Sequence, residues 1–79
     1  MADDTDVAEI MRRPYSRVLT PEGDMFIARI LEFPDVVTEG DSELEALAML
    51  DDAFGGVLHV MVDHGDPIPA PLATREYSG

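Results

Sequence analysis

Two short runs in the first half of the chain contain aromatic and β-branched residues and are separated by turn residues, and this pattern predicts short β-strands. One strand is expected from Tyr15 to Thr20 and a second from Met25 to Glu32. The segment between them, Thr20 to Asp24, has the sequence TPEGD. Proline suits the first corner of a turn and glycine suits a left-handed position. The two strands are therefore expected to form a β-hairpin.

Both faces of the second predicted strand are mostly apolar. Phe26, Ala28 and Ile30 lie on one face. Met25, Ile27 and Leu31 lie on the other face, together with Arg29. One main helix covers only one face of a small sheet. Leaving three such side chains in water costs several kcal/mol at about 25 cal/mol per Å². We therefore expect the second face to be covered by the N-terminal segment, a second copy or a partner.

A corner and a helix start follow the second strand. Phe33-Pro34-Asp35 is expected to break that strand, and Val36 to Glu39 is expected to form a short third strand that ends at Gly40. Ser42 to Glu45 matches the capping box, in which a hydroxyl accepts a backbone N–H and a glutamate reaches back. Asp41 suits the same helix start, because negative charge is favoured at a helix N-terminus.

The predicted helix carries apolar residues at steps of three and four, which is the spacing of one helix face. These residues are Leu47, Leu50, Phe54, Val57 and Met61. We expect them to pack on the sheet, with Phe54 in the core. Gly55-Gly56 either admits another backbone or bends or ends the helix early. Gly65 is the expected stop, and the prolines from Asp66 to Pro71 favour an extended segment.

These elements predict an α+β fold, a small antiparallel sheet of three to four strands with one main helix across it. Residues 1–13 are expected to be an N-terminal tail or a short helix that ends before Pro14. Residues 14–72 are expected to form the domain, and residues 73–79 a C-terminal tail or linker. A chain of 79 residues is long enough for one domain only.

The strongest compositional feature is the net charge of −12, from 17 acidic residues against five arginines and no lysine. Such a surface repels nucleic-acid phosphates and favours encounter with a basic protein. An acidic surface that serves solubility alone is the alternative. The chain has no cysteine, which excludes disulfides and suits a reducing cytoplasm. It has no apolar run of the ~20 residues that a membrane span needs, and we expect that its N-terminus is not a secretory signal, because no basic region precedes an apolar one.

Candidate catalytic chemistry is sparse. His59 and His64 lie five positions apart and do not share a helix face as a zinc-binding pair at i, i+4 does. No nucleophile–base arrangement and no glycine-rich phosphate loop is recognisable. Thr38 to Asp41 contains the only carboxylate cluster suited to magnesium, and a strand-to-helix turn uses aspartate for the helix start more often. We therefore expect no catalytic residue, no cofactor and no metal site, and we expect that the protein is not an enzyme.

Four motifs occur in a fixed order along residues 8–79. They are Pro14-Tyr15, the Phe33-Pro34 corner, Thr38 to Leu47 as T-x-G-D-[ST]-x-x-E-A-L, and Gly65 to Pro71 as G-x-P-I-P-x-P. In this order they resemble the HicB-like antitoxin family. The resemblance implies a reduced ribonuclease-H-like sheet with a helix across it. It also implies the antitoxin role in a type II toxin–antitoxin system, in which the protein binds and silences a HicA-like toxin, a small basic ribonuclease that cleaves mRNA.

The chain departs from the family pattern in two places. Pro34-Asp35-Val36 replaces the common "PGC", which alters the loop tip and is expected to change partner choice. Two-domain members continue "EYSGK" into a ribbon-helix-helix DNA-binding segment, whereas this sequence stops at Glu76-Tyr77-Ser78-Gly79. We expect a truncation at a domain border, with DNA bound only through a segment absent from this chain.

The candidate site residues surround the strand corner. The expected toxin-contacting residues are Glu32, Phe33, Pro34, Asp35 and Glu39, and we expect their acidic members to lie outside the sheet. The expected structural residues are Gly40, Asp41, Ser42, Glu45 and Phe54. The expected partners are the HicA-like toxin and further copies of this chain, with no membrane. Two alternatives remain open, a residual ribonuclease-H-like nuclease and an acidic oligomeric scaffold or regulator with another partner.

Overall fold

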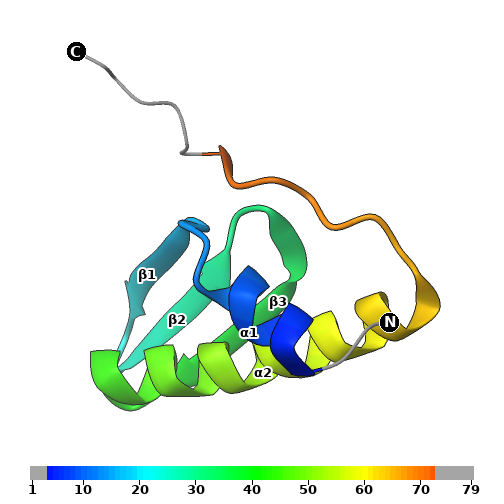
Figure 1. Ribbon diagram of the computed structural model, residues 1–79. Coiled ribbons are helices and arrows are strands. Elements are labelled where there is room, and N and C mark those ends of the chain that lie inside the picture. The colour runs from blue at the N-terminus through cyan, green and yellow to red at the C-terminus, as the bar shows by residue number, and fades with distance from the viewer. Residues whose placement is uncertain (1–3, 73–79) are drawn as a thin grey trace.

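The computed structural model describes residues 4–72 and forms one antiparallel sheet with strand order β1-β2-β3. Helix α2 crosses one face of this sheet, and helix α1 packs beside α2 (Figure 1). The expected α+β class is confirmed, with three strands in the described part of the chain. The elements are α1 (Asp4–Met11), β1 (Arg17–Glu22), β2 (Met25–Ile30), β3 (Phe33–Gly40) and α2 (Glu43–His64).

The β1–β2 hairpin is tighter than predicted. Glu22 pairs with Met25, so only Gly23 and Asp24 form the turn. Gly23 has a φ of 60°, in the left-handed region that glycine adopts without a steric cost. Pro21 lies inside β1 instead of the turn, because β1 is an edge strand on which a residue without an N–H is tolerated.

Strand β3 begins at Phe33, so the predicted break at Phe33-Pro34-Asp35 is wrong. A register shift between Arg29 and Ile30 lets Ile30 pair with Phe33 at the start of the strand. Strand β3 is also an edge strand, which explains why Pro34 fits into it. The corner that the proline suggested is confined to the short connection between β2 and β3.

The predicted helix start is confirmed. Ser42 is the N-cap of α2, and its hydroxyl accepts the Glu45 N–H at 3.1 Å. The Glu45 carboxylate accepts the Asp41 N–H at 3.0 Å, one residue earlier than the usual capping box. The helix ends as expected at Gly65, which has a φ of 72° and donates its N–H to Val62.

The buried stripe of α2 is shifted from the predicted one. Its fully buried residues, spaced four apart, are Ala46, Leu50, Phe54 and Leu58. Leu47, Val57 and Met61 are only partly buried at the flanks of this stripe. The prediction missed Ala46, which lies against Gly40 at the junction with β3, and Leu58, although both belong to the same i, i+4 row as Leu50 and Phe54.

Helix α1 shares the core of the sheet and α2. Val7 and Ile10 are each 5% exposed and belong to the same apolar cluster as Phe54. A Cβ on Gly55 would lie 3.5 Å from the Met11 sulfur, so α1 contacts α2 next to this glycine. Helix α2 continues through Gly55-Gly56 without a break. Helix α1 is a short helix within residues 1–13, as one of the two expectations had it, and it packs against the core of residues 14–72. The expected tail or linker at 73–79 lies outside the described residues.

Candidate partner-binding site

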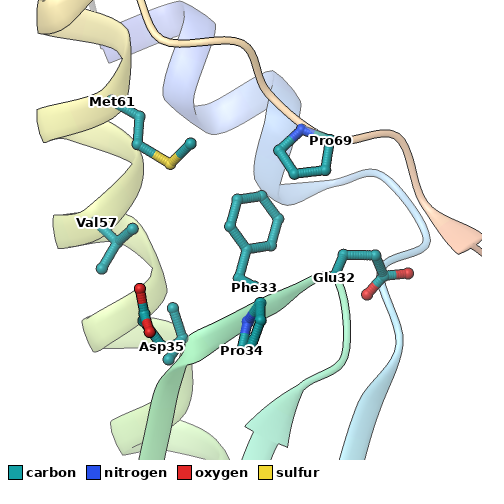
Figure 2. Close-up of a pocket in the computed structure, with 8 residues that line it drawn as sticks. Glu32, Phe33, Pro34, Asp35, Val57, Met61 and Pro69 are labelled. Carbon is teal, nitrogen blue, oxygen red and sulfur yellow. The ribbon is translucent and has the colours of Figure 1, made fainter.

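A cavity of about 210 Å³ lies where the start of β3 faces α2, and we call it the corner cavity (Figure 2). Its wall is mostly apolar and carries two carboxyl residues. The lining residues are Glu32 to Val36 at the start of β3, Val57 and Met61 on α2, and Pro69 after α2. Four of the five residues predicted to contact a toxin, all except Glu39, therefore lie around one cavity.

The inner wall of the cavity is held by three aromatic rings. Phe33 is 5% exposed and lies edge-to-face against Tyr15 and Phe54, at ring-centroid distances of 5.2 and 4.9 Å. Such pairs contribute about 0.5–1.5 kcal/mol beyond the burial of their area. The position of Phe33 is therefore fixed by the core of the protein, although the residue lies at a strand end.

Pro69 lines the cavity from the segment of residues 66–72, which we call the C-terminal strap. This segment has no helix or strand up to Pro71, as the prolines predict, and it runs from the end of α2 back across the molecule (Figure 1). Ile68 packs on the core, and the Tyr15 hydroxyl donates a hydrogen bond to the Pro69 carbonyl at 2.6 Å. This bond joins two of the sequence motifs, Pro14-Tyr15 and the proline-rich segment, that lie at opposite ends of the domain.

Glu32, predicted to contact a toxin, instead holds the C-terminal strap through hydrogen bonds. It is 9% exposed, and its carboxylate accepts the Ser16 N–H at 2.9 Å, the Ser16 hydroxyl at 3.0 Å and the Leu72 N–H at 2.7 Å. Figure 2 shows this carboxylate pointing away from Phe33 and the cavity. Burial raises the pKa of Glu32, but the hydrogen bonds from Leu72 and Ser16 lower it by more, and the pKa lies below its ordinary value of 4.5.

Asp35 and Glu39 lie within β3, so the expectation that they lie outside the sheet is wrong, whereas Glu32 lies in the turn between β2 and β3, outside the strands as expected, and is buried there. The physical reason is that the chain turns at Leu31-Glu32, just after β2, and the backbone N–H of Ser16 needs an acceptor there. Reversing the charge of Glu32 would leave this N–H and that of Leu72 without their acceptor, so the reversal would destabilise the fold as well as change the surface charge.

Asp35 has the opposite surroundings. Its side chain is exposed, and Figure 2 shows its carboxylate directed toward Val57 at the edge of the cavity. Within residues 4–72, the Asp35 carboxylate has neither a hydrogen bond nor an ion pair. Pro34 beside it is exposed as well. The carboxylate of Asp35 is therefore available to a partner.

Glu39 lies apart from the corner cavity, on the side of the sheet that α2 does not cover. It pairs with Ile27 across the β2–β3 ladder, and directly opposite residues share a face. We call this side the open face, and the register and alternation of the strands assign to it Val18, Thr20, Glu22, Met25, Ile27, Arg29, Val37 and Glu39. The backbone of α1 lies near α2 and near none of the strands, so α1 does not cover the open face as the sequence allowed.

The junction between β3 and α2 explains the structural residues of the motif. A Cβ on Gly40 would lie 2.6 Å from the Ala46 backbone nitrogen, so only glycine lets the strand lead directly into the helix. The Thr38 hydroxyl donates to the Ala46 carbonyl at 3.1 Å and ties the two elements together. The exposed Asp41 contributes its backbone N–H to the cap instead of its carboxylate.

The described residues, 4–72, contain no group of three histidine, aspartate or glutamate side chains placed to hold a metal ion. Nor does this part of the chain contain a helix both long and apolar enough to cross a membrane. The nuclease alternative, which placed a magnesium site at Thr38 to Asp41, stays a prediction.

Sequence reasoning did not find Ser16, Val57, Met61 or Pro69 as parts of this site. Val57 and Met61 were recognised only as members of an apolar helix face, and nothing local distinguishes a cavity wall from a core position. A scan against protein-family models and searches of curated proteins and of solved structures found no match for this chain.

Proposed function

We propose that this chain is the toxin-binding domain of an antitoxin, which binds and neutralises a basic HicA-like mRNA-cleaving toxin in the cytoplasm and has no catalytic activity of its own. The observation that carries the proposal is that Phe33, Pro34 and Asp35 gather around one open, mostly apolar cavity. These residues form the corner at which the ordered motifs resemble the HicB-like family. The absence of cysteine suits a reducing compartment.

Charge supports the choice of a basic partner. The net charge of −12 gives the domain a strongly negative field, which accelerates association with a cationic protein. A ribonuclease that binds RNA phosphates presents a basic surface, and an acidic domain docked on that surface keeps RNA away by both volume and charge. Affinity then depends mainly on buried apolar contacts, such as those that the corner cavity and the open face offer.

The open face supports a second element of the proposal, association of the chain with itself. The face carries Met25, Ile27 and Val37 without a covering element in the described part of the chain. A second copy would remove these side chains from water and would offset the small core of a domain of this length. DNA binding lies outside this proposal, because it would require a further segment.

The decisive experiment measures RNA cleavage by a HicA-like ribonuclease, taken from the reading frame beside this gene, with and without a saturating amount of this chain. We expect cleavage to stop in the complex and the association rate to fall steeply as salt rises. The Phe54→Ala variant, whose core is disrupted, serves as a control that is equally acidic. Equal cleavage with and without the wild-type chain would overturn the proposal, and equal protection by Phe54→Ala would reduce it to a non-specific charge effect.

A further inference from the structure

We propose that the corner cavity receives a single arginine side chain of the partner protein, with the methylene stem on the apolar wall and the guanidinium group on the Asp35 carboxylate. The inference deepens the proposed function and rests on it for the identity of the partner only. It assigns one chemical group to one place on the surface, which the resemblance does not.

The size of the cavity selects a side chain over a small molecule. Sites for drug-sized ligands and cofactors span about 300–1,000 Å³, whereas the corner cavity has a volume of about 210 Å³. Phe33, Val57 and Met61 give it an apolar wall on which a hydrocarbon stem loses its contact with water. Long basic side chains pack in this manner, with the stem on an apolar surface and the charged group at its edge.

The polar groups of the cavity select a cation. Glu32 is already occupied by hydrogen bonds from Ser16 and Leu72, and its carboxylate points away from the cavity. Asp35 is therefore the one carboxylate at the cavity that is free to bind, among the residues that the structure describes. One free negative charge beside an apolar recess is complementary to one positive charge on an apolar stem.

Guanidinium fits this arrangement better than ammonium. Its planar donors bind both oxygens of a carboxylate at once, in a fixed geometry. The ammonium group of lysine is more strongly hydrated and binds as a point charge. We therefore expect selectivity for arginine over lysine at this cavity.

The first test uses a small probe and needs no toxin. N-acetyl-arginine-N-methylamide is titrated into the chain carrying ¹³C-labelled methyl groups, and the signals of Val57 and Met61 are followed by NMR. The norleucine and lysine analogues are the controls for an apolar stem and a different cation. We expect the arginine compound to shift both signals at the lowest concentration. Absence of a shift up to the solubility limit, or equal shifts with norleucine, would overturn the inference.

The matched variants are Asp35→Asn and Asp52→Asn. Both residues are exposed, both changes remove one negative charge, and Asp52 lies on α2 outside the cavity lining. We expect Asp35→Asn to weaken binding of the arginine compound by about tenfold or more, because a charge-assisted hydrogen bond is lost. Asp52→Asn should change it by less than about twofold. Equal effects of the two variants would overturn the inference, and melting curves confirm that both remain folded.

The same two variants are then measured against the toxin. Asp35→Asn should weaken the complex by about tenfold, while Asp52→Asn has little effect. If the toxin is silenced equally by both variants, the cavity assignment fails and the antitoxin proposal stands. If the arginine probe binds as expected but the toxin cleaves RNA unhindered, the cavity assignment stands and the antitoxin proposal fails.

Discussion

Strand β2 presents two faces of similar apolar character that have different surroundings. Ala28 and Ile30 are fully buried beneath α2, whereas Ile27 and Arg29, one position away, belong to the open face. The alternation of the strand defines both sets, but it does not say which one the helix covers. The choice is made by α2, whose junction with β3 at Gly40 directs it to one side of the sheet.

The covered face determines stability, whereas the open face is the candidate surface for association. The core between the covered face and α2 contains the large buried side chains, including Phe54, Leu50 and Leu58 of the helix. Most of the hydrophobic contribution to folding comes from this core. The open face contributes little to the core and leaves Val37 47% exposed. Changes on the covered face should therefore unfold the domain, whereas changes on the open face should alter association and leave the fold intact.

The largest effect is expected from Phe54→Ala. This change removes a fully buried ring together with its edge-to-face contacts to Tyr15 and Phe33. The free energy of unfolding should fall by about 3–5 kcal/mol, which is enough to unfold most of a domain this small. The matched control is Val37→Ala on the open face, and urea unfolding compares the two. Similar denaturation midpoints for both variants would contradict the distinction between the faces.

A smaller loss of stability is expected from Glu32→Gln, which weakens the attachment of the C-terminal strap. The amide keeps one oxygen acceptor, so the donors of Ser16 and Leu72 cannot all remain paired. We expect the free energy of unfolding to fall by about 1–3 kcal/mol at neutral pH. A double measurement of unfolding and of proteolysis after residue 65 would show whether the strap is released before the sheet unfolds.

The pH dependence of this contribution follows from the lowered pKa of Glu32. Its folded-state pKa lies below 4.5, so its contribution is present above that value and is lost as the pH falls through the folded-state pKa. As the pH falls from about 5.5 through 4.5 and below, wild-type stability should thus decline more steeply than that of Glu32→Gln. If the stability of the two proteins fell in parallel with pH, the pKa of Glu32 would not be lowered by folding.

Ser42→Ala is expected to have a still smaller effect. It removes the hydroxyl that accepts the Glu45 N–H at the start of α2, and the loss should be about 0.5–2 kcal/mol. Ser42→Asp is the matched control, since aspartate also caps helices. An unchanged denaturant midpoint for Ser42→Ala would mean that the packing of α2 on the covered face, not the cap, fixes the helix start.

Local signals in the sequence were sufficient for the elements whose chemistry is local. The Ser42 cap, the Gly65 stop and the strand alternation all depend on residues within a few positions. The corner cavity was only partly predictable, because it joins β3, α2 and the strap across long separations. Glu32 shows the limit most clearly, since its donors Ser16 and Leu72 lie 16 and 40 positions away. An acidic residue beside a proline corner looks solvated until those donors are placed.

The smallest effect on folding is expected from Val37→Asp, which tests the open face itself. Val37 lies directly opposite Arg29, so the new carboxylate gains a cationic neighbour within the same sheet. The free energy of unfolding of the monomer should therefore change by no more than about 0.5 kcal/mol.

The same charge would be buried against apolar side chains if a second copy covered the open face, and burial of a charge in such an interface is unfavourable. We therefore expect the wild-type chain to sediment as a species of defined stoichiometry, and Val37→Asp to sediment as a monomer. Ala48→Asp adds the same charge at an exposed position of α2 and should leave the assembly intact. If the wild-type chain remains monomeric up to near-millimolar concentration, or if Ala48→Asp disrupts the assembly equally, the open face is not a self-association surface. The apolar residues of β2 on the open face would then be available to contact the toxin and not a second copy of the chain.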